Sequence, residues 1–107
     1  MKQMNVVELA SLLANGLKPT MIDVREEKEL VNGVLDDAIH MPMNEVPGRL
    51  TDLGAEKENM IVLICRTGNR SNQVGMFLEQ NGFNDVVNMV GGMNAWAEKI
   101  DPSMTVY

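Results

Sequence analysis

The chain has 107 residues, with nine Lys and Arg against 15 Asp and Glu, and a formal net charge of −6. This length suits one domain over residues 1–107, which can fold without disulfides or a metal. The acidic balance argues against nucleic-acid binding, because a diffuse negative surface repels phosphates. One cysteine, Cys65, and one histidine, His40, exclude an internal disulfide and argue against a metal centre. No cofactor is expected.

The N-terminal residues lack the long apolar core of a signal peptide, and no apolar stretch reaches membrane-spanning length. We therefore expect no membrane partner and a cytoplasmic location, where a free thiol persists.

Predicted helices and strands alternate along the chain. Asn5 and Glu8 form a weak capping box, after which apolar residues recur at helical spacing. Three Asn-Gly pairs each follow a helical segment, so we expect glycines with positive φ at helix ends, not hairpins. The predicted strands are residues 20–24, 38–41, 60–64 and 86–90. The predicted helices are residues 6–13, 26–31, 69–80 and 93–100, with an interrupted one over 44–53.

The clearest strands are continuously apolar, as in the run from Met60 to Ile64. Strands of this kind are typical of a parallel sheet that is covered on both faces. The sequence therefore predicts an α/β fold. His40, in one of the shorter strands, is expected to be satisfied by backbone or solvent.

The segment Cys65–Ser71 joins the strongest predicted strand to a helix. In open α/β sheets, ligands bind at the carboxyl ends of strands. The helix dipole, inward-pointing backbone N–H groups and the charges of Arg66 and Arg70 all favour a thiolate at Cys65. Cys65 is therefore the predicted nucleophile, and no general base is needed.

The rest of this loop is predicted to bind an anionic substrate. Gly68 allows positive φ and close approach of a ligand, and Arg70 can bind two oxygens at once. The candidate substrate-binding residues are Arg66, Thr67, Gly68, Asn69, Arg70 and Ser71. The structural alternative is a buried, inert cysteine before a polar turn, but packing alone does not require two arginines.

At these residues the chain resembles the rhodanese family of sulfurtransferases, specifically a single-domain member. The loop matches the pattern Cys-x-x-Gly-x-Arg-Ser, and further matches follow in order at Ile22–Arg25, Ala38–Pro42 and Gly91–Trp96. One stretch departs from the family pattern Gly-His-Ile-x-Gly-Ala. Residues Gly33–Ala38 lack its histidine and second glycine, which bears on the geometry of that turn more than on the chemistry.

The resemblance implies a rhodanese-like, doubly wound sheet of about five parallel strands with helices on both faces. It implies that Cys65 takes sulfur from a donor such as thiosulfate or a persulfide and becomes a persulfide itself. Cyanide, a small thiol or a protein thiol then accepts the sulfur. Arg66 or Arg70 would hold the donor's oxyanion. Asp23 and Arg25 receive a structural role near the site, with Arg25 paired to an acid such as Glu29.

Two other functions are weighed against sulfur transfer. Phosphatases and arsenate reductases also place a cysteine and an arginine around an oxyanion, but their loops usually read Cys-x5-Arg. Here four residues separate Cys65 from Arg70, and no second cysteine can act as an internal resolving thiol. A non-catalytic binding module of the same fold is the third hypothesis, and the retained thiol and arginines argue against it.

Overall fold

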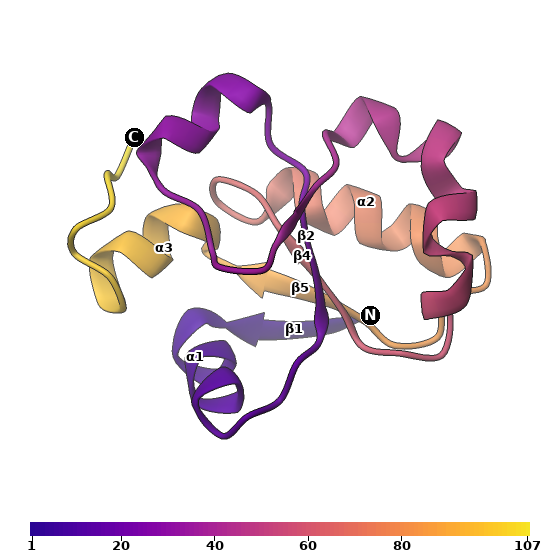
Figure 1. Ribbon diagram of the computed structural model, residues 1–107, viewed down its shortest axis with the longest axis horizontal. Coiled ribbons are helices and arrows are strands. Elements are labelled where there is room, and N and C mark those ends of the chain that lie inside the picture. The colour runs from indigo at the N-terminus through magenta and orange to yellow at the C-terminus, as the bar shows by residue number, and fades with distance from the viewer.

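Helices pack on both faces of a parallel β-sheet in the computed structural model, which describes residues 1–107 (Figure 1). The five strands lie in the order β1-β5-β4-β2-β3, and all neighbouring pairs are parallel. The strands are β1 (Lys2–Asn5), β2 (Thr20–Asp23), β3 (Ile39–His40), β4 (Ile61–Ile64) and β5 (Val86–Val90). The α-helices are α1 (Val6–Ala14), α2 (Asn69–Gln80) and α3 (Gly92–Lys99), and the 3₁₀ helices are η1 (Glu27–Asn32), η2 (Met43–Glu45) and η3 (Pro47–Glu56). The predicted fold class is confirmed.

The strand β1 was not predicted from the residue pattern. Only Met4 among its four residues is partly buried, so the segment shows no apolar run. It forms the edge of the sheet and pairs in parallel with β5, from Lys2 beside Val87 to Asn5 beside Val90. The five strands expected from the family resemblance are present, and backbone pairing defines the fifth one.

The predicted helix ends are confirmed at α1 and at the Asn-Gly pairs. Asn5 accepts a hydrogen bond from the Glu8 N–H at 2.8 Å, and the Glu8 carboxylate accepts one from the Asn5 N–H at 3.2 Å. Gly16, Gly33 and Gly82 have φ values of 88°, 120° and 90°. A glycine adopts these angles without the steric cost that a side chain adds.

The predicted helical segments between β2 and β4 are 3₁₀ helices. The segment over 26–31 is η1, and the interrupted segment over 44–53 divides into η2 and η3. Pro47 stands in the first turn of η3, where its missing N–H has no partner to lose, and Arg49 departs from helical φ and ψ. These short tight helices cover the sheet where no long apolar face is available.

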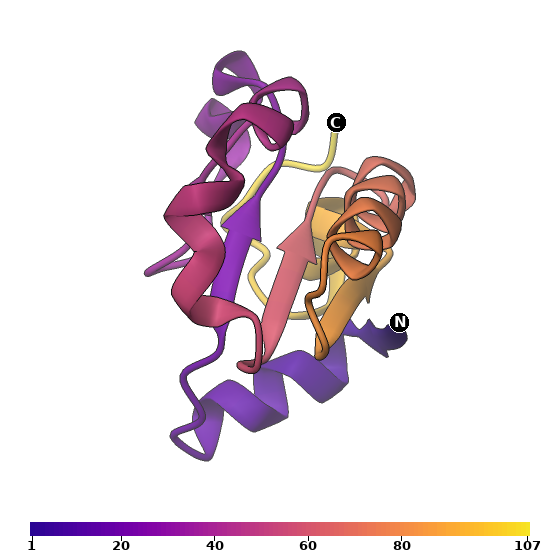
Figure 2. The same ribbon diagram turned by 90° about the vertical axis from the view of Figure 1, so that its right-hand side faces the viewer.

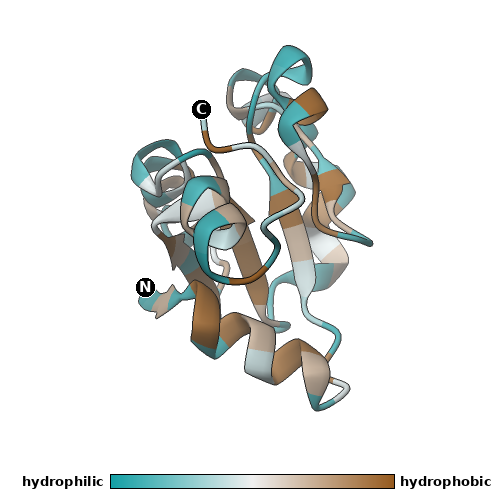
Figure 3. Ribbon diagram, turned by 90° about the vertical axis from the view of Figure 1, so that its left-hand side faces the viewer, coloured by the Kyte–Doolittle hydropathy of each residue, from teal (hydrophilic) through white to brown (hydrophobic).

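Two apolar layers lie between the sheet and its helices. Along β4, Ile61 and Leu63 face the layer under α2 and η3, while Val62 and Ile64 face the layer under α1 and α3. All four side chains are 0% exposed. This burial on both faces explains the continuous apolar run, and the hydrophobic colour follows the strands through the middle of the molecule (Figure 3). No helix has the length and apolar content needed to cross a lipid bilayer.

The turn before β3 has a left-handed residue at the position where the family pattern has its second glycine. Asp37 stands in that position with φ of 66°, and it is the only non-glycine residue with positive φ. Aspartate tolerates this region better than most residues, because its short side chain can hydrogen-bond locally. The turn in Gly33–Ala38 thus has an aspartate at positive φ where the family pattern has its second glycine.

Candidate active site

Cys65 directly follows β4, at the carboxyl end of the central strand of the sheet. Figure 2 shows the β4 arrow between its neighbouring strands. The side chain is 1% exposed. Its Sγ accepts hydrogen bonds from the backbone N–H of Gly68 at 3.1 Å and of Ser71 at 3.4 Å, and lies 3.2 Å from Ser71 Oγ. Gly68 has φ of 104°, which turns the loop back toward the sulfur. The loop therefore encloses the sulfur with inward-facing donors.

These donors change the ionisation of the thiol. Burial raises the pKa of Cys65, but hydrogen bonds from the Ser71 hydroxyl and from the N–H groups of Ser71, Gly68 and Thr67 outweigh it. The pKa therefore lies below its ordinary value, because these bonds favour the charged form. Of the three effects expected from the sequence, the hydrogen bonds from loop N–H groups lower the pKa here, and the Ser71 hydroxyl adds a further bond that was not expected.

The start of α3 holds the other side of the loop. Met93 N–H donates to the Cys65 carbonyl at 2.8 Å, and Asn94 N–H donates to the Arg66 carbonyl at 3.0 Å. Gly92, with φ of 60°, lies so close that a Cβ there would overlap the carbonyl groups of Cys65 and Arg66. Gly92 is thus required for close contact between α3 and the loop Cys65–Ser71, which we name the nucleophile loop after its predicted nucleophile.

Arg70 points into a bidentate ion pair with η1. Its two terminal nitrogens each donate to a carboxylate oxygen of Glu29 at 2.8 Å. The hydrogen bonds from Arg70 lower the pKa of Glu29 to about 2, and the carboxylate in turn raises the pKa of Arg70. Arg70 therefore links α2 to η1 across 41 positions of the chain.

Arg25 pairs with Asp23 and not with the Glu29 carboxylate, so that prediction was wrong. Arg25 is 0% exposed, and its Nη2 and Nε lie 2.8 Å and 3.0 Å from the carboxylate oxygens of Asp23. Arg25 also donates to the backbone carbonyl of Gly33 at 2.8 Å and to that of Glu29 at 3.4 Å. The side chain folds back onto its own strand end, which leaves the Glu29 carboxylate free to bind Arg70.

Tyr107 joins these groups, although nothing in its sequence position indicated it. Its hydroxyl donates to Glu29 at 2.8 Å and accepts from Arg25 at 3.1 Å. Its main-chain oxygen accepts from Arg66 and, at 3.0 Å, from Asn94, and the guanidinium of Arg66 lies 5.0 Å from the centre of the Tyr107 ring. Both loop arginines thus have protein partners in this structure.

Asn88 is a second residue that the sequence argument missed. Its side chain is 4% exposed, and its Oδ1 lies 2.5 Å from Ser71 Oγ. A polar residue within the otherwise apolar strand β5 is the one sequence feature that could have pointed to it. His40, as expected, is satisfied by backbone, with Nε2 2.8 Å from the Arg25 carbonyl oxygen.

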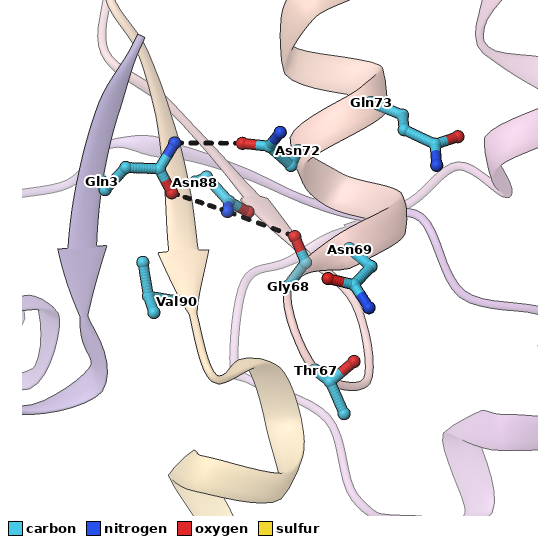
Figure 4. Close-up of a pocket in the computed structure, with 8 residues that line it drawn as sticks. All are labelled: Gln3, Thr67, Gly68, Asn69, Asn72, Gln73, Asn88 and Val90. Carbon is cyan, nitrogen blue, oxygen red and sulfur yellow. Dashed lines mark hydrogen bonds between the residues drawn. The ribbon is translucent and has the colours of Figure 1, made fainter.

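A polar pocket of about 530 Å³ lies on the outer side of the loop (Figure 4). Its lining residues come from β1, the loop, α2 and β5, and five of them are Asn or Gln. They are Gln3, Thr67, Gly68, Asn69, Asn72, Gln73, Asn88 and Val90. Three of the predicted substrate-binding residues, Thr67, Gly68 and Asn69, thus face this pocket. No group of three or more His, Cys, Asp or Glu side chains is placed to hold a metal ion.

The fold and the site together define an α/β protein with a buried cysteine of lowered pKa at the end of a central parallel strand. Residues 5–99 match the family described as Rhodanese-like domain, and the chain belongs to that family. It is 40% identical over 82 residues to the putative sulfurtransferase YtwF of Bacillus subtilis, covering 77% of each chain. It is 34% identical over 89 residues to a sulfurtransferase of Allochromatium vinosum, covering 83% of this chain and 81% of the relative.

The solved structures agree. A rhodanese-like domain protein from Staphylococcus aureus superposes with a TM-score of 0.84 at 32% identity, covering 100% of this chain and 99% of the other. The chain is thus a member of the rhodanese-like sulfurtransferase family, and its relatives are named for sulfur transfer.

Proposed function

We propose that this protein carries sulfane sulfur as a persulfide on Cys65, taking it from thiosulfate or a persulfide and passing it to cyanide or a thiol. The observation that supports this most is the ring of donors around Sγ. Hydrogen bonds from Gly68, Ser71 and Thr67 stabilise a negative sulfur without a general base. A persulfide anion needs the same stabilisation as a thiolate, so one loop serves both halves of the reaction.

In the first half-reaction, the Cys65 thiolate attacks the outer sulfur of thiosulfate. A new S–S bond forms at Cys65, the S–S bond of thiosulfate breaks, and sulfite leaves with the bonding electron pair. In the second, cyanide or a thiolate attacks the outer sulfur of the persulfide, and Cys65 leaves as thiolate. The products are thiocyanate or a new persulfide, and no external oxidant or reductant is required. The expected kinetics are ping-pong.

We propose that Arg66 binds the anionic donor and that Arg70 mainly fixes the loop. Arg66 is exposed, and its partners are one main-chain oxygen of Tyr107 and the face of the Tyr107 ring. Arg70 is partly buried and is held by the Glu29 carboxylate through two hydrogen bonds. An incoming sulfonate displaces the single oxygen contact of the exposed Arg66 more readily than the two charge-assisted hydrogen bonds of Arg70. The polar loop residues Thr67 and Asn69 would contact the substrate from the rim.

We further propose that the protein works in the cytoplasm, where its single thiol stays reduced. A small thiol fits the loop as acceptor, and a protein thiol fits if it stands on an exposed segment.

The test is an intact-mass measurement of the purified protein after incubation with thiosulfate. We expect a gain of one sulfur atom, its loss on addition of cyanide or a thiol, and neither event in Cys65→Ser. An unchanged mass together with hydrolysis of an aryl phosphate would instead support the phosphatase-type function. If neither activity is found, the non-catalytic binding module becomes the better interpretation.

A further inference from the structure

Asn88 lies between the nucleophile loop and the polar pocket, and the proposed reaction gives it no role. It is the one polar side chain of β5, and it is buried. Burying a carboxamide in an apolar strand costs free energy unless its donors and acceptor are satisfied. All of its polar atoms have partners, so the arrangement of those partners shows what the side chain does.

These partners fix the direction in which the carboxamide points. The Gly68 carbonyl can only accept a hydrogen bond, so Asn88 Nδ2 is the donor to it, at 3.2 Å. The same nitrogen donates to Gln3 Oε1 at 2.9 Å. Asn88 Oδ1 therefore faces Ser71 Oγ at 2.5 Å, and the Ser71 hydroxyl must be the donor because the carbonyl oxygen carries no proton.

The Ser71 hydroxyl has only one proton but lies next to two acceptors. The second is Cys65 Sγ, at 3.2 Å. While the proton points to Asn88, the hydroxyl oxygen can only accept from a Cys65 S–H. When the sulfur is negative, a charge-assisted bond draws the proton to the sulfur, and the buried Asn88 oxygen loses its donor. Asn88 and the charged sulfur thus compete for the same proton.

We propose that Asn88 is a positioning residue that acts on Cys65 through Ser71, holding the hydroxyl proton while the sulfur is neutral and yielding it when the sulfur is charged. This inference rests on the proposed function, in which the sulfur is negative before attack. The hydrogen-bond chain reaches the pocket surface, because Gln3 Nε2 donates to Asn72 Oδ1 at 3.0 Å (Figure 4). One hydrogen-bonded relay therefore runs from the buried sulfur to the pocket wall, and it is formed by Cys65, Ser71, Asn88, Gln3 and Asn72.

The charged and titratable groups around the loop are separate from this relay and remain unchanged in the variants below. Arg70 acts on the sulfur through its charge. The others on the surrounding elements are Asp23 and Arg25 after β2, Glu29 on η1, Arg66 in the loop, and Tyr107.

The test is the rate of Cys65 alkylation by iodoacetamide across pH, followed by intact mass. This readout reports ionisation of the thiol and needs no sulfur donor. In Asn88→Leu, which has nearly the same shape, the sulfur is the only acceptor left for Ser71. We expect the midpoint of the profile to fall by about one pH unit. In Ser71→Ala it should rise, and the double variant S71A/N88L should keep the midpoint of S71A.

The matched control is Val87→Ala, which loosens a neighbouring buried position of β5 without touching the relay. Its midpoint should equal that of the wild type. An unchanged or higher midpoint in N88L, a shift that persists without Ser71, or an equal shift in V87A overturns the proposal.

If N88L does not fold, Asn88→Asp carries the test. The carboxylate introduced by N88D binds the Ser71 proton more strongly than the Asn88 oxygen does. The alkylation midpoint should therefore rise more in N88D than it does when N88D is added to S71A. Equal rises in the two backgrounds overturn the proposal. Persulfide loading by thiosulfate is measured in parallel. Absence of loading with the N88L shift intact contradicts the proposed function but leaves the role of Asn88 standing.

Discussion

Arg66 and Arg70 flank the same thiol but are held to different degrees. Arg70 is partly buried and forms two hydrogen bonds with a carboxylate, whereas the exposed Arg66 contacts one main-chain oxygen and an aromatic ring. The loop thus combines one arginine fixed in an ion pair with one that can exchange its partners. Substitutions at these two positions should therefore have different consequences.

Arg66→Ala is expected to raise the KM for thiosulfate by about 10- to 100-fold, since a hydrogen bond to a charged group contributes about 1.5–3 kcal/mol. Stability should change little, because the side chain is exposed. Steady-state kinetics with thiosulfate and with an alkyl persulfide, which has no sulfonate group, measure the effect. Arg66→Lys, which keeps the charge, should lose less. An equal loss with both donors would mean that the substitution damages the loop and not the oxyanion contact.

The ion pair of Glu29 makes stability depend on pH. Its pKa is lowered from 4.5 to about 2 in the folded protein because Arg70 holds the charged form. The ion pair therefore stabilises the folded protein fully above pH 4.5, the pKa of Glu29 in the unfolded chain, and this stabilisation is lost as the pH falls from about 4.5 toward 2. With allowance for screening at the partly exposed Arg70, we expect the pair to add about 1–2 kcal/mol to the free energy of unfolding at pH 7.

Urea unfolding of the wild type and of Glu29→Gln at pH 7 and pH 3 measures this term. The difference between the two proteins should be clear at pH 7 and much smaller at pH 3. Glu27→Gln, on the same helix and exposed, is the control and should show neither effect. A difference that stays constant between the two pH values would contradict the assignment to the ionised carboxylate.

At the scale of elements, two glycines in helices meet opposite environments. A Cβ on Gly92 would overlap the backbone of the nucleophile loop, whereas a Cβ on Gly48 in η3 meets nothing within 4 Å. Gly92→Ala should therefore destabilise the protein by at least about 2 kcal/mol and abolish sulfur loading. Gly48→Ala should change neither stability nor sulfur loading. Thermal unfolding and intact mass after thiosulfate test the pair, and normal loading in G92A would show that α3 can shift without disturbing the loop.

The turn before β3 allows a similar comparison between neighbouring exposed residues. Asp37 is left-handed and Asp36 is not. A β-branched residue is strained at positive φ, so Asp37→Val should cost about 1–2 kcal/mol and Asp36→Val close to nothing. Chemical denaturation distinguishes them. Equal effects would mean that burial or charge, and not backbone conformation, decides stability in this turn.

Across the whole molecule, the sequence predicts those features whose interactions join residues close together in the chain. The bounds of α2 and β5 follow from apolar periodicity and coincide with residues 69–80 and 86–90. The nucleophile loop is also local, because its donors lie within six positions of Cys65. Its spacing, the single cysteine and the motifs that resemble the rhodanese family together predicted a sulfur-binding loop.

The remaining features depend on contacts between distant segments. The Glu29 to Arg70 pair spans 41 positions, and the Ser71 to Asn88 contact spans 17. The pairing of β1 depends on an edge of β5 that no pattern within residues 2–5 can show. Arg25 had two acids within reach in sequence, and only the packed structure determines which of them it binds.

The burial of Cys65 has a consequence for what an acceptor meets on this protein. The thiol is 1% exposed, whereas an S–S bond places a second atom about 2 Å beyond it. In the proposed persulfide, the outer sulfur would therefore be the atom that an acceptor reaches first, because Sγ of Cys65 stays buried behind it. Attack on the outer sulfur passes it on directly, and a mixed disulfide with the cysteine itself should form rarely.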